Sequence, residues 1–349
     1  MKFGLVFHTP WPEGTDPSRV NEEMTEQIQL GEELGFYGTW MAEHHFSRYG
    51  IASSSTVLAS SIAARTSKIR IGMAVLVPPL HNPIRLAEET AMLDRISGGR
   101  LDIGFGRGSA LYEYAGYGID RGESQARFRE AIEMVCGLWT TPDFCYEGKY
   151  YHVEHANLVP PPVQSPHPPV YIAATRTPET LDFASRSGHP LLVGTVLDTA
   201  DAIDLCRRFL AKAEAAGHHF SISQIPFGRY LHVAPTDEQA QDDTRRAMNW
   251  VQDMIQWRGT ISEGSEVYQK LDDFRARRSS LPPSYEHIYA HRGFFGTPDT
   301  VAAKISAVQR EGIEAFGCGF AFGDIAHTKV MRSMELFARE VMPRFDLAT

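Results

Sequence analysis

The strongest constraint on the fold is an alternation of short apolar segments with amphipathic ones along most of the chain. Runs such as "FGLVF" (3–7) are typical of buried strands, and longer stretches such as "RVNEEMTEQIQLGEELG" (19–35) have helical spacing. The predicted strands lie at 3–7, 37–42, 69–77, 101–106, 170–174, 190–194, 226–234 and 315–322. Strands that alternate with helices form parallel sheets, and eight units favour a closed, eight-stranded parallel β/α (TIM-type) barrel. An open doubly wound sheet is the alternative.

We expect a single domain over residues 1–349, with two interruptions of the alternation. The proline-rich stretch 158–169 predicts an extended surface passage. Residues 257–292 show little periodicity, few large apolar side chains and interspersed charges. Such a stretch buries too little area to offset about 1–2 kcal/mol per residue of backbone ordering. We therefore predict an active-site lid between the seventh and eighth units, ordered only when the site is occupied.

Composition narrows the class of protein. The net charge of −9 gives no support for binding to nucleic acid or to an anionic membrane, which needs a basic face. The four cysteines are scattered without a C-x-x-C pair, which favours reduced thiols over a zinc site or a disulfide framework. No apolar run approaches the ~18 residues that span a bilayer, and the first residues lack signal-peptide features. We expect a cytoplasmic enzyme.

Polar or glycine-rich motifs follow four consecutive predicted strands. They are "EHH", "VPPLHNP", "GRGSALYEY" and "TRTPET", after the second, third, fourth and fifth strands. In a β/α barrel the catalytic residues lie at the carboxyl ends of the strands. The four motifs are therefore expected on one face, and this shared placement is stronger evidence than any single motif.

The first motif contains Glu43, His44 and His45. A metal site is possible in principle, but adjacent strand residues point to opposite sides, so the two histidines do not easily share one ion. We therefore predict no metal. A histidine at the mouth of a barrel is suited to acid–base chemistry, because it changes charge near neutral pH. A purely structural role for both histidines is the alternative.

The fourth-strand motif "GFGRG" places Gly104, Gly106 and Gly108 at alternate positions. The spacing differs from the dinucleotide fingerprint G-x-G-x-x-G. Alternate glycines at a strand end let a flat ligand approach the backbone, although simple barrel curvature is an equal explanation. Arg107 between them is well placed to meet an anionic or carbonyl-rich ligand.

The "TRTPET" motif predicts a phosphate site. Thr177 is a natural N-cap and Pro178 a natural first helical residue, so the free N–H groups there can bind an anion. Arg176 adds charge, and the hydroxyls of Thr175, Thr177 and Thr180 add donors. The alternative is an ordinary capped helix. A phosphate site, a glycine-flattened wall and a titratable histidine on one face together suit a phosphorylated planar cofactor such as FMN.

The chain resembles the bacterial luciferase-like, flavin-dependent monooxygenases. The resemblance rests on blocks such as "GFYGTWMAEHHF", "RIGMAVLVPPLHNPIRLAEE", "LDRISGGRLDIGFGRG" and "GTPDTVAAKI", whose order and spacing are highly specific. It implies a barrel that takes reduced FMN from a separate NAD(P)H-dependent flavin reductase. It also implies that O2, activated as a flavin hydroperoxide, supplies one oxygen atom to a small organic substrate. Aromatic residues near the mouth (Trp11, Tyr112, Tyr114 and Tyr117) favour an apolar substrate.

The resemblance also implies roles for individual residues. His44 matches the catalytic histidine, with Glu43 and His45 beside it in the flavin pocket. Ala74 and Val75 match a third-strand pair, often joined by a non-proline cis bond, that presses on the flavin ring. The flavin and phosphate segments correspond to Gly106, Arg107, Gly108, Ser109, Thr175, Arg176, Thr177 and Thr180.

Two departures from luciferase itself count against light emission: Gly106 replaces a reactive cysteine, and Arg176 replaces a glutamate. Relatives dimerise through helices that correspond here to 56–67 and 83–96, so a homodimer is expected. Two other functions stay open, namely hydride transfer with a deazaflavin on the same barrel and flavin binding without catalysis.

Overall fold

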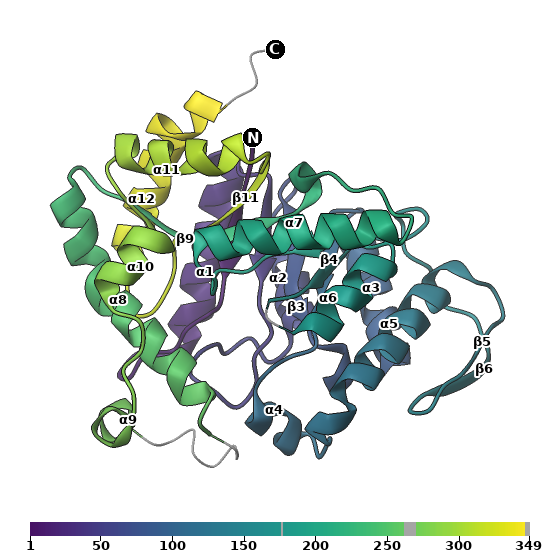
Figure 1. Ribbon diagram of the computed structural model, residues 1–349. Helices are drawn as coiled ribbons and strands as arrows, with labels where there is room; N and C mark the ends of the chain where they lie inside the picture. Colours follow the sequence, from purple (N-terminus) through teal and green to yellow (C-terminus); the bar gives the residue numbers. More distant parts are fainter. Residues whose placement is uncertain (176, 262–269, 346–349) are drawn as a thin grey trace.

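The computed structural model describes residues 1–175, 177–261 and 270–345. Its centre is a curled parallel sheet of nine strands, in the order β10-β9-β11-β1-β2-β3-β4-β7-β8, with helices around it (Figure 1). The strands are β1 (Lys2–Phe7), β2 (Gly38–Met41), β3 (Arg70–Leu76), β4 (Leu101–Phe105), β7 (Val170–Ala173), β8 (Leu191–Leu192), β9 (Phe227–Val233), β10 (Phe294–Gly296) and β11 (Ala315–Gly319). The eight predicted strands are all present, although β8 is shorter than expected.

The helices connect successive strands, as crossovers between parallel strands require. They are α1 (Pro17–Glu33), α2 (Ser55–Ala63), α3 (Pro83–Ile96), α4 (Leu111–Gly116), α5 (Ser124–Thr140), α6 (Pro178–Arg186), α7 (Thr199–Ala215), α8 (Asp237–Arg258), α9 (Leu271–Arg277), α10 (Tyr285–His291), α11 (Pro298–Arg310) and α12 (His327–Glu340). Several begin with a cap followed by proline. Asn82, for example, accepts hydrogen bonds from the first-turn N–H groups of α3 at 3.0 and 3.2 Å. None of the helices in the described ranges is long and apolar enough to cross a bilayer.

The sheet differs from the expected barrel in two places. The added strand β10 pairs with β9, and β8 is joined to β9 by one isolated parallel bridge between Val193 and Phe227. At this bridge Val193 donates to the Pro226 carbonyl at 2.9 Å and accepts from the Gly228 N–H at 2.8 Å. A curled nine-stranded sheet is therefore present, whereas a continuous ladder between β8 and β9 is not seen in the described residues. The structure also adds a hairpin, β5 (Phe144–Glu147) and β6 (His152–Ala156), beside α5 (Figure 1).

The described part of residues 257–292 is more regular than the sequence pattern indicates. Their described part forms the end of α8, then α9 and α10, and it buries Trp257, Leu271, Phe274 and Ile288 in one apolar cluster. The apolar residues are few, but Leu271 and Phe274 lie three positions apart on one face of a helix, so a short helix can bury both. Residues 262–269 of the predicted lid lie outside the described residues.

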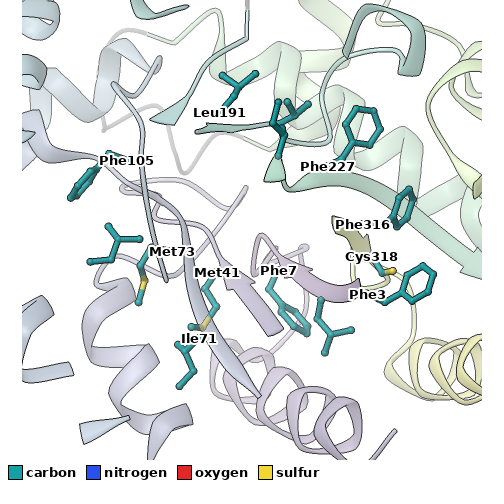
Figure 2. Packing of buried hydrophobic residues seen from close by; sticks show 14 of the residues in the cluster. Phe3, Phe7, Met41, Ile71, Met73, Phe105, Leu191, Phe227, Phe316 and Cys318 are labelled. Carbon is teal, nitrogen blue, oxygen red and sulfur yellow. The ribbon is translucent and has the colours of Figure 1, made fainter. Parts of the chain in front are cut away.

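The main core fills the space between the sheet and the helices. Alternate strand residues such as Phe3, Met41, Met73 and Phe316 are almost fully buried there, and Figure 2 shows their packing. This arrangement follows from the period of two along a strand, which directs one set of side chains to the helices and the other to the inside of the curled sheet. The second set, and the loops beyond it, form the site.

Candidate active site

A cleft of about 250 Å³ lies at the carboxyl ends of the strands. Every predicted site residue that the structure describes lines it except His45: Glu43, His44, Ala74, Val75, Gly106, Arg107, Gly108, Ser109, Thr175, Thr177 and Thr180. Arg176 lies outside the described residues. The shared face predicted from the four motifs therefore exists, and it brings together residues more than 130 positions apart in the sequence.

His44 lies in the cleft with two oppositely charged neighbours on the same ring nitrogen. Its Nδ1 is 3.3 Å from Oε1 of Glu113 and 3.3 Å from Nη2 of Arg258. Arg258 is the last residue of α8, and its guanidinium lies over the ring of Tyr49 at 4.3 Å and donates to the Tyr112 hydroxyl at 2.9 Å. Nε2 of His44 forms no hydrogen bond with a described residue, so it is free for a ligand in the cleft.

Burial and the charge of Arg258 favour the neutral imidazole of His44 by lowering its pKa. Burial lowers the pKa of His44, the positive charge of Arg258 lowers it further, and Glu113 opposes both without overcoming them. Burial alone would raise the pKa of Glu113, but its contacts with His44 and Arg258 bring it below the ordinary value. The site therefore combines a neutral histidine, a buried carboxylate and a buried guanidinium, and a neutral histidine can accept a proton.

His45 does not line the cleft, and it lies after the end of β2, where the alternation of strand side chains no longer applies. Its Nε2 donates to Oε1 of Glu43 at 2.9 Å, and its Nδ1 accepts from the Tyr117 hydroxyl at 3.1 Å. His81 donates to the same Glu43 oxygen at 2.8 Å. Both nitrogens of His45 are thus occupied by protein partners. Its role in the structure is to hold the buried Glu43 and the loop after β2.

His8, directly after β1, is a cleft residue that the sequence analysis did not select. It is hydrogen-bonded to Thr195 at 3.3 Å, and its ring is near those of Tyr49 and Tyr230. Burial lowers the pKa of His8 to about 3, with further contributions from His44 and Arg258. It is therefore neutral at physiological pH, and its position after a strand end was the signal that could have identified it.

The other end of the cleft is basic. Nη1 of Arg107 donates to Ser124 at 3.1 Å, and its Nη2 donates to Thr177, the N-cap of α6, at 3.2 Å. Arg121, also missed from the sequence, donates to Ser124 at 2.7 Å. The Nε atoms of both arginines are buried without a hydrogen-bond partner among the described residues. Burial and the nearby Arg121 lower the pKa of Arg107.

The glycines of the fourth-strand motif also allow close packing against the neighbouring strand. A Cβ on Gly104, Gly106 or Gly108 would lie 2.4–2.8 Å from Met73, Val75 or Val77 of the neighbouring strand and the residue after it. The glycines therefore make room for alternate residues of β3 and its continuation, and Gly106 and Gly108 also line the cleft. The peptide bond between Ala74 and Val75 is cis, as the resemblance implies.

The aromatic residues expected near the mouth do not line the cleft. Tyr112 and Tyr114 are fully buried in packing, and Trp11 stacks with Arg48 away from the site. The apolar part of the cleft comes instead from Tyr49, Val75, Val77 and Val196.

We compared the chain with known protein families. Residues 1–315 match the family described as luciferase-like monooxygenase. The chain belongs to the luciferase-like monooxygenase family. This luciferase-like protein is 27% identical to the oxygenase component of flavin-dependent trigonelline monooxygenase from Acinetobacter baylyi, over 99% of this chain and 96% of the relative. It is accordingly a flavin-dependent monooxygenase.

Two solved structures share its fold. One is the oxygenating constituent of 3,6-diketocamphane monooxygenase from Pseudomonas putida in complex with FMN, with a TM-score of 0.82, 19% identity and 99% coverage of both chains. The other is the coenzyme F420-dependent tetrahydromethanopterin reductase from Methanopyrus kandleri, with a TM-score of 0.74, 21% identity and again 99% coverage of both chains. The fold thus occurs with two different cofactors.

Proposed function

We propose that this protein is the oxygenase of a two-component system. It takes reduced FMN from a separate NAD(P)H-dependent flavin reductase and transfers one oxygen atom from O2 to a small, apolar organic substrate. The observation that carries the proposal is the cleft itself, which is lined by Arg107, with Arg121 beside it on the shared partner Ser124, and by a neutral His44.

The residues present fit a phosphorylated flavin. The N-terminus of α6 and the two guanidiniums supply donors for a dianionic phosphate, and their unpartnered Nε atoms are groups that an anion can satisfy. Ala74 and Val75 supply an apolar surface for a ring. When bound, reduced flavin supplies the electrons for the reaction with O2.

The remaining chemistry belongs to His44 and its neighbours. When Nδ1–H donates to Glu113, Nε2 carries a lone pair toward the cleft and can take up a proton there. Arg258 opposes the charge of Glu113 and disfavours a charged imidazole, so the proton can be released again. Tyr49 and Arg258 pack against this group, with the guanidinium 4.3 Å from the centre of the Tyr49 ring, and leave the His44 side chain 18% exposed.

Titration with FMN and with riboflavin, which lacks the phosphate, tests the cofactor assignment. Losing one charge-assisted hydrogen bond costs about 1.5–3 kcal/mol, so Arg107→Ala and Arg121→Ala should each weaken FMN binding about tenfold or more. Riboflavin binding should change little. Arg186→Ala, at the exposed far end of α6, is the matched control and should leave both affinities unchanged. Equal losses for FMN and riboflavin would contradict a phosphate site.

Arg176 completes the proposed phosphate site on sequence grounds, since it lies next to the N-cap Thr177. We propose that Arg176→Ala also weakens FMN binding selectively, about tenfold. We likewise propose that residues 257–292 act as a lid, which is supported by Arg258 reaching the cleft from the start of that stretch. The bridge between Val193 and Phe227 supports closure of the sheet into an eight-stranded barrel.

Hydride transfer with a deazaflavin is the second candidate, because the same fold occurs in the Methanopyrus kandleri reductase. The absorption spectrum of the bound cofactor separates the two, since FMN and deazaflavins absorb at different wavelengths. A non-catalytic flavin carrier is less well supported, because such a protein has no need of the buried His44, Glu113 and Arg258 group.

A further inference from the structure

A second cavity, of about 760 Å³, runs through the inside of the curled sheet. It begins at the amino ends of the strands, near Lys2, Tyr37 and Glu314, and reaches the floor of the cleft. Residues that line both cavities include His8, Ala74, Val75, Thr175, Gly194 and Thr195. We call this second cavity the bore. It connects the amino ends of the strands to the cleft.

The bore is open because a layer of side chains is missing. The inside of a β/α barrel is normally filled by layers of bulky, branched side chains and is not a pore. Here Gly228, Gly317, Gly4 and Gly38 lie in register across β9, β11, β1 and β2. Three of these glycines, Gly228, Gly317 and Gly4, line the bore, so this side contributes no side chains at that level.

Trp40 does not fill the gap. A Cβ on Gly72 would lie 2.3 Å from the Trp40 ring, so the indole rests against the glycine of the neighbouring strand. Trp40 meets the ring of Tyr171 edge-on, with the ring centroids 5.5 Å apart. Val6, Trp40 and Tyr171 remain partly exposed although they point to the inside of the sheet. Solvent-sized space therefore exists beside them.

The chemistry of the bore changes along its length. Lys2, Asp102, Gln224 and Glu314 lie around its outer mouth, whereas Val6, Trp40, Leu192 and Ala173 form the wall nearer the cleft. Polar side chains return only where the bore meets the cleft, at His8, Thr175 and Thr195, so ions and strongly hydrated molecules cross the apolar part at a cost. A small apolar molecule enters without that cost.

We propose that the bore is a channel for dioxygen, which reaches the cleft through the inside of the sheet. The choice of dioxygen rests on the proposed function, in which O2 is consumed in the cleft. The cofactor and the organic substrate would enter the cleft at the carboxyl ends of the strands. The bore would still be open at the amino ends of the strands. The route is thus separate from the one that the larger ligands need.

Xenon tests the bore without cofactor or catalysis, because it binds dry apolar cavities and is readily located in crystals. Crystals of the wild-type protein under xenon pressure should show the gas between Val6 and Trp40. Xenon elsewhere only, or ordered water filling the inner part, would overturn the proposal.

A plugging variant tests the route itself. Val6→Trp should slow the second-order reaction of O2 with the reduced FMN complex about fivefold or more, and leave the affinity for FMN unchanged. Val159→Trp makes the same change at an exposed site and should have no effect. Leu192→Trp narrows the bore from another strand, at a residue that does not line the cleft, and serves if Val6→Trp does not fold. An unchanged oxygen rate in a folded plugged variant would overturn the proposal.

The two proposals can fail separately. If the wild-type protein binds no FMN, the proposed function fails, and xenon still decides whether the bore accepts an apolar gas. If FMN binds and oxidises at equal rates in all variants, the function stands and the channel is wrong.

Discussion

The proton chemistry of the site depends on one ring nitrogen, Nδ1 of His44. It lies at equal distance from a carboxylate that can only accept and a guanidinium that can only donate. When Nδ1 donates to Glu113, Nε2 is a base. When Nδ1 accepts from Arg258, Nε2 carries the proton and can donate. The ring can therefore act as base or acid by changing its tautomer, without a change of side-chain position.

We expect His44→Ala to fold and to bind FMN, but to lose coupled oxygen transfer. General acid–base groups contribute about 10²–10⁴-fold, so product formation should fall by at least about 10²-fold while O2 is still consumed and released as hydrogen peroxide. Peroxide and product are measured in the same reaction. His219→Ala, at an exposed histidine, is the control. Full coupling in His44→Ala would exclude the assigned role.

Arg258 should determine the pH at which enzyme activity is lost as the solution is acidified. Because it lowers the pKa of His44, the imidazole stays neutral, and so able to act as a base, to a pH below the ordinary value of 6.5. Removing the charge in Arg258→Gln raises that pKa, so activity should be lost at a higher pH as the solution is acidified. Arg258→Lys keeps the charge and should keep the acid limb near its wild-type position. Identical profiles for all three proteins would show that Arg258 does not act through His44.

Whether a site residue could be predicted from the sequence depended on its distance from a strand end. Glu43, His44 and Arg107 lie just after strand ends, and strand ends of a parallel sheet share one edge, so position alone predicted their meeting, whereas Val75 was indicated by the family resemblance. Arg258 is 214 positions from His44 and arrives at the far end of a long helix. No local pattern predicts where such a helix ends in space.

Among the elements, α9 is held in place by a polar anchor on α8. Asp253 is buried, and it accepts from Nε of Arg275 at 2.7 Å and from Arg278. Leu271 and Phe274 bury the apolar face of the same short helix. Two basic residues of the stretch 257–292, Arg275 and Arg278, are therefore tied to α8, and the composition of the stretch alone gave no sign of this partner.

Breaking the anchor should expose α9 to protease. Asp253→Asn removes the charge shared by Arg275 and Arg278, and hydrogen bonds to a charged group contribute about 1.5–3 kcal/mol. Cleavage of a locally opened segment follows the population of the open form, so trypsin should cut at 275–278 about tenfold faster or more. Asp272→Asn removes only an exposed partner of Arg275 and should change the rate little. Equal rates in both variants would mean that Asp253 does not anchor α9.

Element length decided which parts of the fold could be predicted. α3 has a cap, a first-turn proline and fourteen residues of helical spacing, and each signal indicates the same helix. β10 has three residues, and α9 and α10 have seven each. Segments this short form only against partners distant in the sequence, since isolated short helices and strands are not stable. Local pattern therefore predicted the sheet order but missed these additions.

For the whole molecule, the remaining expectation is a homodimer, and the structure offers a surface that suits it. Val57 on α2 is 70% exposed, and Met92 and Ile96 on α3 are 47% and 50% exposed. Met92 and Ile96 are four positions apart and so lie on one face of α3. α2 packs beside α3, and the Thr56 hydroxyl donates to Glu89 at 3.2 Å between them. Exposed apolar side chains grouped on adjacent helices mark an interaction surface.

We propose that two copies associate through this face of α2 and α3. Light scattering at micromolar concentration should give twice the mass of one chain for the wild-type protein, and the mass of one chain for a Val57→Lys, Ile96→Glu double variant. Two buried charges in an apolar interface cost several kcal/mol, which is enough to separate the copies at that concentration. Leu281→Glu changes an equally exposed apolar residue elsewhere and should leave the dimer intact. A wild-type protein with the mass of one chain would rule the dimer out, and a double variant that stays dimeric would place the interface on another face.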